Sequence, residues 1–507
     1  MAPGANPSNL ITSLGIPTRD RPDLLGRALS SYVENAARFD RSFHYAIMDD
    51  SREIAGQVQN RAHLKVLKRR FGVPIHYATR DQRALFADAV AARAGVPKDL
   101  ARFALLGDGV SAATYGATRN ALLLDSVGEV TVQADDDTVC HISASPGRKE
   151  GLALTTRTDA NELWFFGSRE DAIGAGPRVD IEMAAIHEQL LGKRPAVCVA
   201  ASEASGQELD MATTESLLID SIKASKARVA VSFMGIRGDA GAPYPFRFLH
   251  GGSTVDRLLL SEQAYQVAMT TRHVIRAASR LSISNGPFCM TTNIGLDHRS
   301  LLPPFMPVLR NEDGVFGCLL SVCFPNAFKG YSPYTVVHSP SETREAISAS
   351  PQSRYTTFLC NSFLAWIIMS VDDHSFGRDA AQNLRLLGAC LRKLGTLSQR
   401  DFSDFMQTLT RRVMKVNVAH AEQELAERPE APTYWKDDVV AYLNVLKKAV
   451  AHPEFAVPKD LAGNPAERIA RFRALVNQYG VLLIHWPDIC EAALALRDKG
   501  RRLATAV

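Results

Sequence analysis

Paired cysteines are missing from this sequence. Its eight cysteines are spread over 507 residues, and no two of them form a Cys-x-x-Cys motif. Neither a zinc knuckle nor a redox dithiol is therefore indicated. Scattered thiols are typical of a protein in a reducing compartment, which favours a cytoplasmic location.

A secretory signal and a long apolar run are also missing. The first residues, MAPGANPSNLITSLGIP, contain no basic stretch followed by an apolar segment, so they do not resemble a signal peptide. The most apolar run, 358–371, contains Asn361 and Ser362 and is shorter than the roughly 20 residues of a membrane span. We expect a buried helix there and no transmembrane segment.

The sequence has no large excess of charge of one sign, because its net charge is only +4. The short basic runs Lys68–Arg70 and Arg497–Arg502 are interpreted as solvated helix ends. No aromatic residues alternate with them, as a single-strand binder requires, so nucleic acid is not indicated as a partner.

The composition itself is that of a globular protein, with 46% hydrophobic and 22% charged residues. A chain of this length exceeds what one hydrophobic core usually supports, so two or three domains are expected.

The first part of the chain alternates short apolar runs with helical patterns. We predict strands at 10–16 (ended by Pro17), 44–48, 73–77 and 129–134, and helices that begin at Asp23 and span 115–126. Such alternation predicts an α/β domain with a mostly parallel sheet.

The middle and the end of the chain have different patterns. In the middle, 181–191 predicts a helix, 287–294 predicts a strand, and the glycine-rich stretch 235–243 is either a mobile loop over a ligand or a surface connection. From about residue 354 the pattern is helical only, with Ser398 and Asp401 marking one helix start. Proline-containing breaks are expected at 429–432 and 453–458.

Asp135, Asp136 and Asp137 directly follow the strand predicted at 129–134. Three adjacent carboxylates repel one another, and a divalent cation such as Mg²⁺ or Mn²⁺ would relieve that repulsion. Ligands of open α/β sheets bind beyond the carboxyl ends of the strands, where this cluster falls. A solvated acidic turn is the alternative interpretation.

The same layout resembles the nucleotide-binding half of GT-A glycosyltransferases, and most closely family 2. The resemblance rests on Ile16-Pro-Thr-Arg19, on Asp49-Asp50, on Ala117-Thr-Arg-Asn-Ala-Leu-Leu123 and on Val132-Gln-Ala-Asp-Asp-Asp137. It covers roughly 10–141 and resumes at 285–344.

The resemblance implies a fold and a division into domains. We expect a GT-A-like, Rossmann-type nucleotide-sugar-binding domain at 1–345, whose segment 142–285 is a long middle insertion on the acceptor side. A C-terminal all-α domain is expected at 346–507, and it could mediate homo-oligomer formation.

The resemblance also assigns roles around the acidic cluster. Asp137 matches the direct metal ligand, Asp135 the residue near the ribose and the metal, and Asp136 could take either role. Arg119 matches a position that lines the donor, although a surface helix arginine is an equally good interpretation.

The resemblance also implies that two further segments bind the donor. The turn Pro17-Thr18-Arg19 resembles the segment that holds the nucleotide base. Asp49 or Asp50 resembles the acidic residue that faces the uracil or the ribose.

A second acidic motif, Glu312-Asp313, lies in the segment Arg310-Asn-Glu-Asp-Gly-Val-Phe-Gly317. It resembles the acceptor-side Glu-Asp motif of the family, in which the aspartate takes the proton of the acceptor hydroxyl. A hydroxyl is a weak nucleophile at neutral pH and needs such a base. Asp313 is the candidate base, with Glu312 as its substitute, and a single displacement implies inversion. The alternative interpretation is that Glu312 and Asp313 are acidic residues at a helix N-terminus, where the helix dipole favours them, and this is compatible with the catalytic role.

His338 follows the apolar run Tyr334-Thr-Val-Val. A lone histidine in such a place is usually structural, but the family resemblance allows it to be a third metal ligand with Asp135 and Asp137.

These observations predict a metal-dependent, inverting glycosyltransferase with a nucleotide-sugar donor, UDP-linked by resemblance, and an unidentified hydroxyl acceptor. A sugar-nucleotide nucleotidyltransferase is one alternative, but 16–20 is a poor match to the glycine-rich basic loop that it would need. A non-catalytic binding module with a structural cation is another. A carboxylate-metal phosphoesterase or nuclease is the weakest, because no further His-Asp constellation accompanies the motif.

Overall fold

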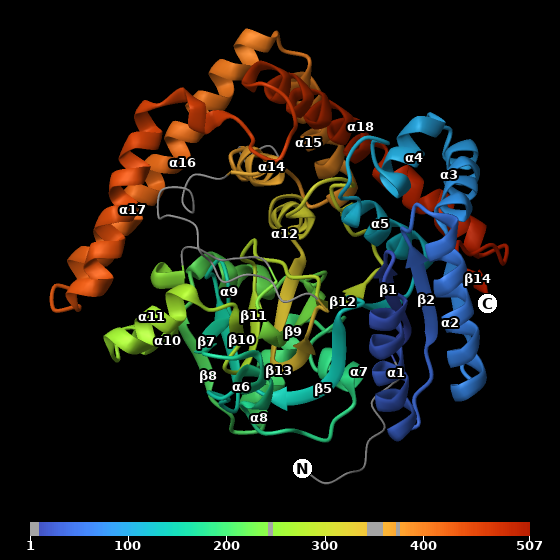
Figure 1. Cartoon of the computed structure of the whole chain (residues 1–507), viewed down its shortest axis with the longest axis horizontal. Coiled ribbons are helices and arrows are strands. Elements are labelled where there is room, and N and C mark those ends of the chain that lie inside the picture. The colour runs from blue at the N-terminus through green and yellow to red at the C-terminus, as the bar shows by residue number, and fades with distance from the viewer. Residues whose placement is uncertain (1–9, 242–246, 342–357, 372–375) are drawn as a thin grey trace.

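The computed structural model describes residues 10–241, 247–341, 358–371 and 376–507. Within them the protein is a mixed α/β structure, with one 14-stranded sheet and a C-terminal helical region (Figure 1). The predicted boundary between 345 and 346 lies outside the described residues.

The N-terminal part alternates strands and helices, as the sequence predicts. Its elements are β1 (Ile11–Thr18), α1 (Pro22–Arg38), β2 (His44–Asp49), α2 (Ile54–Phe71), β3 (Ile75–Ala78), α3 (Arg80–Ala94), α4 (Lys98–Leu106), α5 (Tyr115–Asp125) and β4 (Val130–Ala134).

Strands β3, β2, β1 and β4 lie side by side in that order and are all parallel. Leu14 of β1, for example, is opposite Tyr45 of β2 and Val132 of β4. The chain leaves β1 toward β2 on one side and later returns to place β4 on the other. The space beyond the carboxyl ends of β1 and β4 is therefore a topological switch point, where open α/β sheets bind ligands.

The middle part extends this sheet. Its elements are β5 (Thr138–Ala144), β6 (Leu152–Thr155), β7 (Glu162–Phe166), α6 (Arg169–Gly174), α7 (Met183–Glu188), α8 (Pro195–Ala204), β8 (Leu209–Thr213), α9 (Ser216–Ile222), β9 (Arg228–Asp239), η1 (Arg247–Leu249), α10 (Ser253–Leu258), α11 (Glu262–Thr270), β10 (His273–Ala277), β11 (Leu281–Ser284), β12 (Asn293–Asp297), α12 (Glu312–Cys323) and β13 (Ala327–His338).

Strand β12 pairs antiparallel with both β4 and β9, so it joins the parallel group to the strands of the middle part. Strand β13 runs parallel to β9, and β5 pairs antiparallel with β13. These pairings bring the end of β13 beside the start of β5, where His338 is opposite Thr138.

The C-terminal part is helical until its last residues. Its elements are α14 (Cys360–Met369), α15 (Ala380–Gly395), α16 (Gln399–Glu427), α17 (Thr433–Ala451), η3 (Pro453–Ala456), α18 (Pro465–Arg497) and β14 (Thr505–Ala506). Strand β14 pairs antiparallel with β3 and forms an edge of the N-terminal parallel group, which the helical pattern did not predict.

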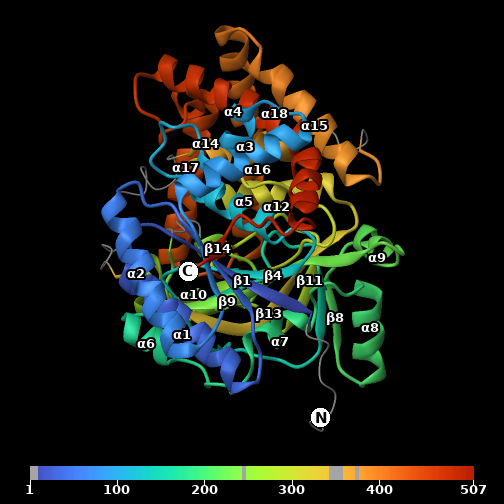
Figure 2. The same ribbon diagram turned by 90° about the vertical axis from the view of Figure 1, so that its right-hand side faces the viewer.

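Alternate residues of the strands build two cores, because successive side chains of a strand point to opposite faces. Tyr45 and Ile47 of β2 pack with α1 and α2, whereas Ala46 and Met48 join a larger core that continues through α3–α5 and α12 into the C-terminal helices. Figure 2 shows these helices gathered on one side of the sheet.

One helix among the described residues, α18, is long and apolar enough to cross a membrane by length and composition. Its most apolar window is 56% buried inside the protein. Trp486 of this helix is fully buried, and its indole nitrogen donates to the carbonyl of Leu302 at 2.8 Å. Burial of this kind is typical of a helix in a protein core.

Pro17 does not end the first strand, as the sequence predicted, because β1 continues to Thr18. Pairing of β1 with β4 stops at Gly15. A proline two residues later therefore breaks no ladder hydrogen bond on that side.

The glycine-rich stretch 235–243 was predicted as a loop, but 235–239 belongs to β9 and is buried. A Cβ atom at Gly235 would lie 2.5 Å from the carbonyl oxygen of Arg276 in the neighbouring strand. This glycine is needed for close strand approach rather than for mobility. Residues 242 and 243 lie outside the described residues.

Two other predicted elements differ from the structure. The strand predicted at 287–294 begins only at Asn293, because Pro287 and the residues after it form no ladder. The helix predicted at 181–191 is shortened to Met183–Glu188. Helices α3 and α4 were not predicted, and of α2 only its basic end at 68–70 was.

The C-terminal predictions are mostly confirmed. The side chain of Ser398 accepts a hydrogen bond from the backbone of Asp401 at the start of α16, and the two proline-containing breaks separate α16, α17 and α18. The run 358–371 contains the buried helix α14. Residues 354–357 lie outside the described residues.

Candidate functional site

The acidic cluster lies at the switch point between β1 and β4. Strand β4 ends at Ala134, and Asp135, Asp136 and Asp137 form the turn into β5. Asp136 and Asp137 are each only 6% exposed. The burial of adjacent carboxyl groups is costly unless partners compensate for it, so the partners of each aspartate define the site.

The turn itself is fixed by Thr138. The backbone N–H of Thr138 donates to the carbonyl of Asp135 at 3.1 Å, and the Thr138 hydroxyl donates to the same oxygen at 2.7 Å. Since that hydroxyl has only one hydrogen, the hydroxyl of Tyr32, 2.9 Å away, must donate to Thr138.

This hydrogen-bond chain continues into the middle part of the protein. The side-chain amide of Asn293 donates to Tyr32 at 3.0 Å, and Nε2 of His187 donates to the Asn293 oxygen at 2.8 Å. Burial lowers the pKa of His187 to about 4, so the ring is neutral at pH 7. Its Nδ1 then accepts from Ser232 at 2.7 Å. All donors point the same way along the chain, toward the turn that carries the aspartates.

Asp136 is held by residues at the end of β1. The hydroxyl of Thr18 donates to Asp136 at 2.8 Å, and the guanidinium of Arg21 lies 3.4 Å from it. Arg21 also lies 3.8 Å from Asp137. Burial and the negative charge of Asp137 nevertheless raise the pKa of Asp136 to about 7, so Thr18 and Arg21 compensate its charge only in part.

Asp137 faces His338, whose Nε2 lies 3.3 Å from its carboxylate. The other ring nitrogen, Nδ1, donates to the backbone carbonyl of Asp239 at 2.7 Å. Burial opposes the protonation of His338, but the hydrogen bond and the charge of Asp137 outweigh it and raise the pKa to about 9. An Nδ1–H held by a carbonyl is the arrangement that orients Nε2 of a metal-binding histidine.

Arg119 joins the two acidic motifs. This arginine of α5 is 4% exposed and donates to Asp135 at 2.5 Å. Its Nε lies 3.8 Å from the carboxylate of Glu312. The sequence left open whether Arg119 lines the site or the surface, and its burial excludes the surface interpretation.

Glu312 and Asp313 begin helix α12, where the helix dipole favours negative charge. Burial is the largest cause that raises the pKa of both carboxyl groups, and for Glu312 the charge of Asp313 adds to it. Asp313 accepts a hydrogen bond from the backbone of Gly314 at 2.8 Å.

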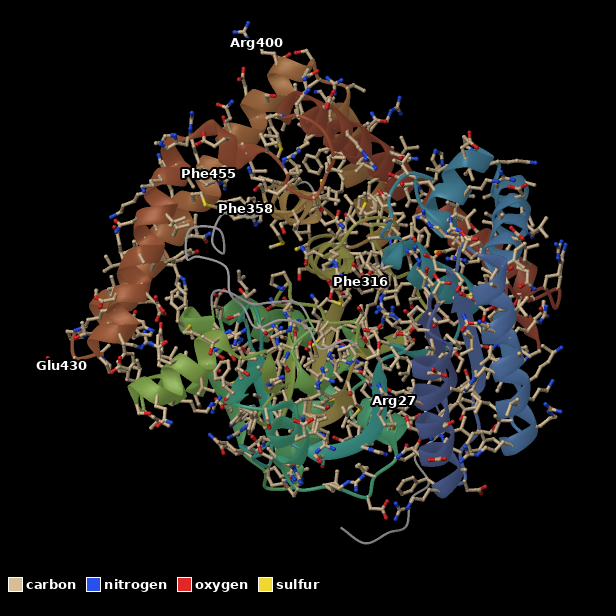
Figure 3. All side chains as sticks on the ribbon, viewed as in Figure 1. Arg27, Phe316, Phe358, Arg400, Glu430 and Phe455 are labelled. Atoms are coloured by element: carbon tan, nitrogen blue, oxygen red, sulfur yellow. The ribbon has the colours of Figure 1, made fainter. Side chains whose placement is uncertain are left out.

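The backbone before α12 is strained. Leu309 and Asn311 have φ values of 69° and 70°, in the left-handed region that a bulky residue rarely adopts. The N–H of Leu309 donates to the carbonyl of Ala113 at 2.9 Å. One turn into the helix, the buried ring of Phe316 stacks on Phe305 at 4.2 Å, and Figure 3 shows Phe316 in the interior of the molecule. The start of α12 is therefore anchored on both sides.

The predicted metal ligands are brought together only in part. Among the described residues, no three His, Cys, Asp or Glu side chains are grouped closely enough to hold a metal ion. Asp137 and His338 are in contact, while Asp135 is turned toward Arg119. One or two protein ligands are sufficient for Mg²⁺, which usually completes its shell with water and phosphate oxygens. Of the three predicted metal ligands, Asp137 and His338 are thus in contact, and Asp135 is not in contact with them.

Asp49 or Asp50 was predicted to face the uracil or the ribose. The two residues are 0% and 4% exposed, and both carboxylates form hydrogen bonds within the protein. Asp49 accepts from the backbone of Ser51 at 2.7 Å and from Asn60 at 3.0 Å, and also from Tyr77.

Asp50 is bound by Arg80, Arg83 and Thr114. Although burial opposes ionisation, Arg83, Thr114 and Arg80 lower the pKa of Asp50. In this structure the hydrogen bonds of both aspartates hold the end of β2, and a nucleotide-facing role for one of them stays a prediction.

The residues of the predicted base-binding turn, Pro17-Thr18-Arg19, have different contacts in the structure. Thr18 contacts Asp136, as described above, and Pro17 lies within β1. Arg19 is half-buried and donates to the carbonyl of Ala112 at 2.6 Å, so it contacts the loop before α5.

Sequence reasoning missed Arg21 and the chain of hydrogen bonds from His187. Arg21 stands two residues after Arg19, and the position of Asp23 in the first helical turn could have drawn attention to it. His187 carries no local signal, since its partners Ser232 and Asn293 are distant in sequence.

Two cavities have volumes of about 670 and 630 Å³, and the first borders the site through Val337 and Ser339, the neighbours of His338. The first is lined mainly by α1 and α2, and the second by the ends of α12 and α14. None of the predicted site residues lines either cavity.

Comparisons of this chain with protein-family models, with curated proteins and with solved structures found no match.

Proposed function

We propose that this chain is a metal-dependent, inverting glycosyltransferase that transfers a sugar from a nucleotide donor to a hydroxyl group. One observation carries the proposal: five carboxyl groups, those of Asp135, Asp136, Asp137, Glu312 and Asp313, gather at the switch point of the sheet, and Nε2 of an oriented histidine faces one of them. A UDP-sugar donor and a cytoplasmic location are part of the proposal.

Asp137 and His338 would hold a Mg²⁺ or Mn²⁺ ion, with Asp135 beside them. When bound, the ion supplies Lewis-acid neutralisation of the charge that develops on a leaving diphosphate. Arg21 and Arg119 already lie against these aspartates, and their guanidinium groups are suited to bind phosphate oxygens.

Asp313 would take the proton of the attacking hydroxyl. Burial and the neighbouring Asp135 raise the pKa of Asp313, although its hydrogen bond from Gly314 and the charge of Arg119 oppose the shift. A carboxyl group with a raised pKa is a better base near neutral pH than an ordinary aspartate. Glu312, one residue earlier, is its substitute in this proposal.

The test is a panel of nucleotide sugars with Mn²⁺, in which slow hydrolysis is measured without an acceptor. We expect Asp137→Ala to lose donor binding and at least about 100-fold in turnover, because a well-placed charge stabiliser contributes that much. Asp313→Asn should lose turnover to a similar extent but retain donor binding. Asp20→Asn is the matched control, since Asp20 is an exposed carboxylate at the same sheet edge that pairs with Arg19.

Each alternative has its own outcome in this experiment. Tight donor binding by Asp137→Ala would contradict the metal assignment. Exchange of pyrophosphate into the nucleotide sugar would indicate a nucleotidyltransferase. Stabilisation by Mn²⁺ without any donor turnover would indicate a structural cation.

A further inference from the structure

Helix α2 has an exposed apolar stripe. Ile54, Val58, Ala62 and Val66 are spaced four residues apart, so they share one face of the helix. Ile54 is 76% exposed, Val58 61% and Val66 53%, and Ala62 is exposed as well. The opposite face contains the buried residues that hold α2 on the sheet, so packing among the described residues does not account for the stripe.

The same helix is basic and contains no acidic residue. Its 18 residues include Arg61, Lys65, Lys68, Arg69 and Arg70. Of these, only Arg70 forms an ion pair within the part of the chain that the structure describes, with Glu34 at 3.3 Å.

Lys65 and Arg69 are exposed and lie on the same face as the apolar stripe, since Lys65 follows Ala62, and Arg69 follows Val66, by three residues. The sequence interpretation of 68–70 as a solvated helix end therefore covers only part of a longer basic and apolar face.

We propose that this face of α2 docks on the surface of an anionic lipid bilayer. A basic helix with an apolar face is typical of proteins that lie in the membrane interface. Anionic headgroups match the unpaired charges of Lys65 and Arg69, and the acyl boundary beneath them accepts Ile54 and Val58. Nucleic acid would match the charges but gives no role to the exposed aliphatic side chains.

The position of α2 allows this contact. It lies at the outer edge of the molecule in both views (Figures 1 and 2), and Figure 3 shows its side chains projecting outward from that edge. The apolar stripe begins at Ile54, five residues after β2 ends at the edge of the sheet that carries the acidic site. Val110, which is 71% exposed, lies on the neighbouring loop that Arg52 contacts through the carbonyl of Ser111 at 2.7 Å. The candidate site would thus open beside the bilayer.

The test uses the full chain and vesicles of phosphatidylcholine alone or with phosphatidylserine mixed in. Co-sedimentation should require phosphatidylserine and should weaken with salt, because screening shortens the reach of exposed charges. The double variant Lys65→Gln/Arg69→Gln should bind about thirtyfold more weakly, at about 1 kcal/mol for each basic residue near such a surface.

A matched control is Arg411→Gln/Lys415→Gln on α16, which removes two exposed basic residues elsewhere and should leave vesicle binding unchanged. Ile54→Ser/Val58→Ser changes only exposed side chains and should also weaken binding. Melting temperatures of all variants establish that they are folded.

Three results would overturn the proposal: equal binding to vesicles without phosphatidylserine, equal loss in the α16 control, and no vesicle binding at all. Stronger binding to single-stranded RNA than to the vesicles would reassign the face to nucleic acid and would equally overturn it. None of these outcomes depends on whether the acidic site transfers sugars.

Discussion

Strands β2 and β4 lie on either side of β1, and each leads into adjacent aspartates. The electrostatics of the two acidic clusters are nevertheless opposite. At the end of β2, Arg83, Thr114 and Arg80 lower the pKa of Asp50. At the end of β4, burial and the charge of Asp137 raise the pKa of Asp136 to about 7. The same residue type at the same sheet edge therefore has a structural role where cations compensate it, and we assign a ligand-binding role where they do not.

The largest expected effect concerns the β2 end. Asp50→Ala leaves Arg83, which is 0% exposed, without its carboxylate partner. Such a loss typically costs about 3–5 kcal/mol, and we expect a urea unfolding curve to report a change of this size. If Asp136→Asn lowered the free energy of unfolding as much as Asp50→Ala does, the aspartates after β4 would have a structural role like that of Asp50, which would contradict the comparison.

The next effect is a pH dependence at the β4 end. The folded pKa of His187 is lowered to about 4 by burial, whereas an unfolded histidine has a pKa near 6.5. Between these values the unfolded state binds the additional proton, so stability falls as the pH falls from about 6.5 to about 4, by about 3 kcal/mol. Unfolding measured across this pH range should show a flatter profile for His187→Gln, and an unchanged profile would contradict the buried neutral ring.

A smaller effect is expected from Tyr32→Phe. The substitution removes the hydroxyl that accepts from Asn293 and donates to Thr138, and should cost about 1–2 kcal/mol. Because Thr138 fixes the turn that carries the aspartates, we also expect Mn²⁺ affinity to fall by about tenfold, as for other residues that orient metal ligands. Isothermal titration measures the affinity. Ser13→Ala is the control, since the Ser13 hydroxyl is buried without a hydrogen-bond partner in the described residues.

The smallest effect is a gain. Asp136→Asn retains an oxygen that can accept from Thr18 and removes the repulsion from Asp137. We expect it to stabilise the metal-free protein by up to about 1 kcal/mol while it weakens Mn²⁺ binding. Thermal melts with and without Mn²⁺ separate the two effects, and a loss of stability without Mn²⁺ would place Asp136 among the structural aspartates.

The opposite electrostatics of the β2 and β4 ends could not be predicted from the sequence, for a physical reason. Both acidic clusters follow apolar strands, so local pattern places both at the carboxyl edge of the sheet. The residues that neutralise Asp50 are Arg80, Arg83 and Thr114, which lie 30 to 64 positions further along. These partners are too distant in sequence for a local pattern to include them. The lowered pKa of Asp50 and the raised pKa of Asp136 could therefore not be predicted.

The same limit applies elsewhere in the fold. Helix α5 and the strands β1–β4 were predictable because their apolar periodicity is local. The role of Gly235 was not, because the atom that excludes a side chain there belongs to Arg276 in another strand. His187 was missed for the same reason, since both of its partners come from other elements.

The pairing of β14 with β3 has a consequence for biosynthesis. The edge of β3 that β14 covers stays open while the ribosome translates more than four hundred further codons, roughly the interval from 78 to 505. An open strand edge can pair with another nascent chain. We expect this interval to be the period in which the polypeptide depends most on chaperones.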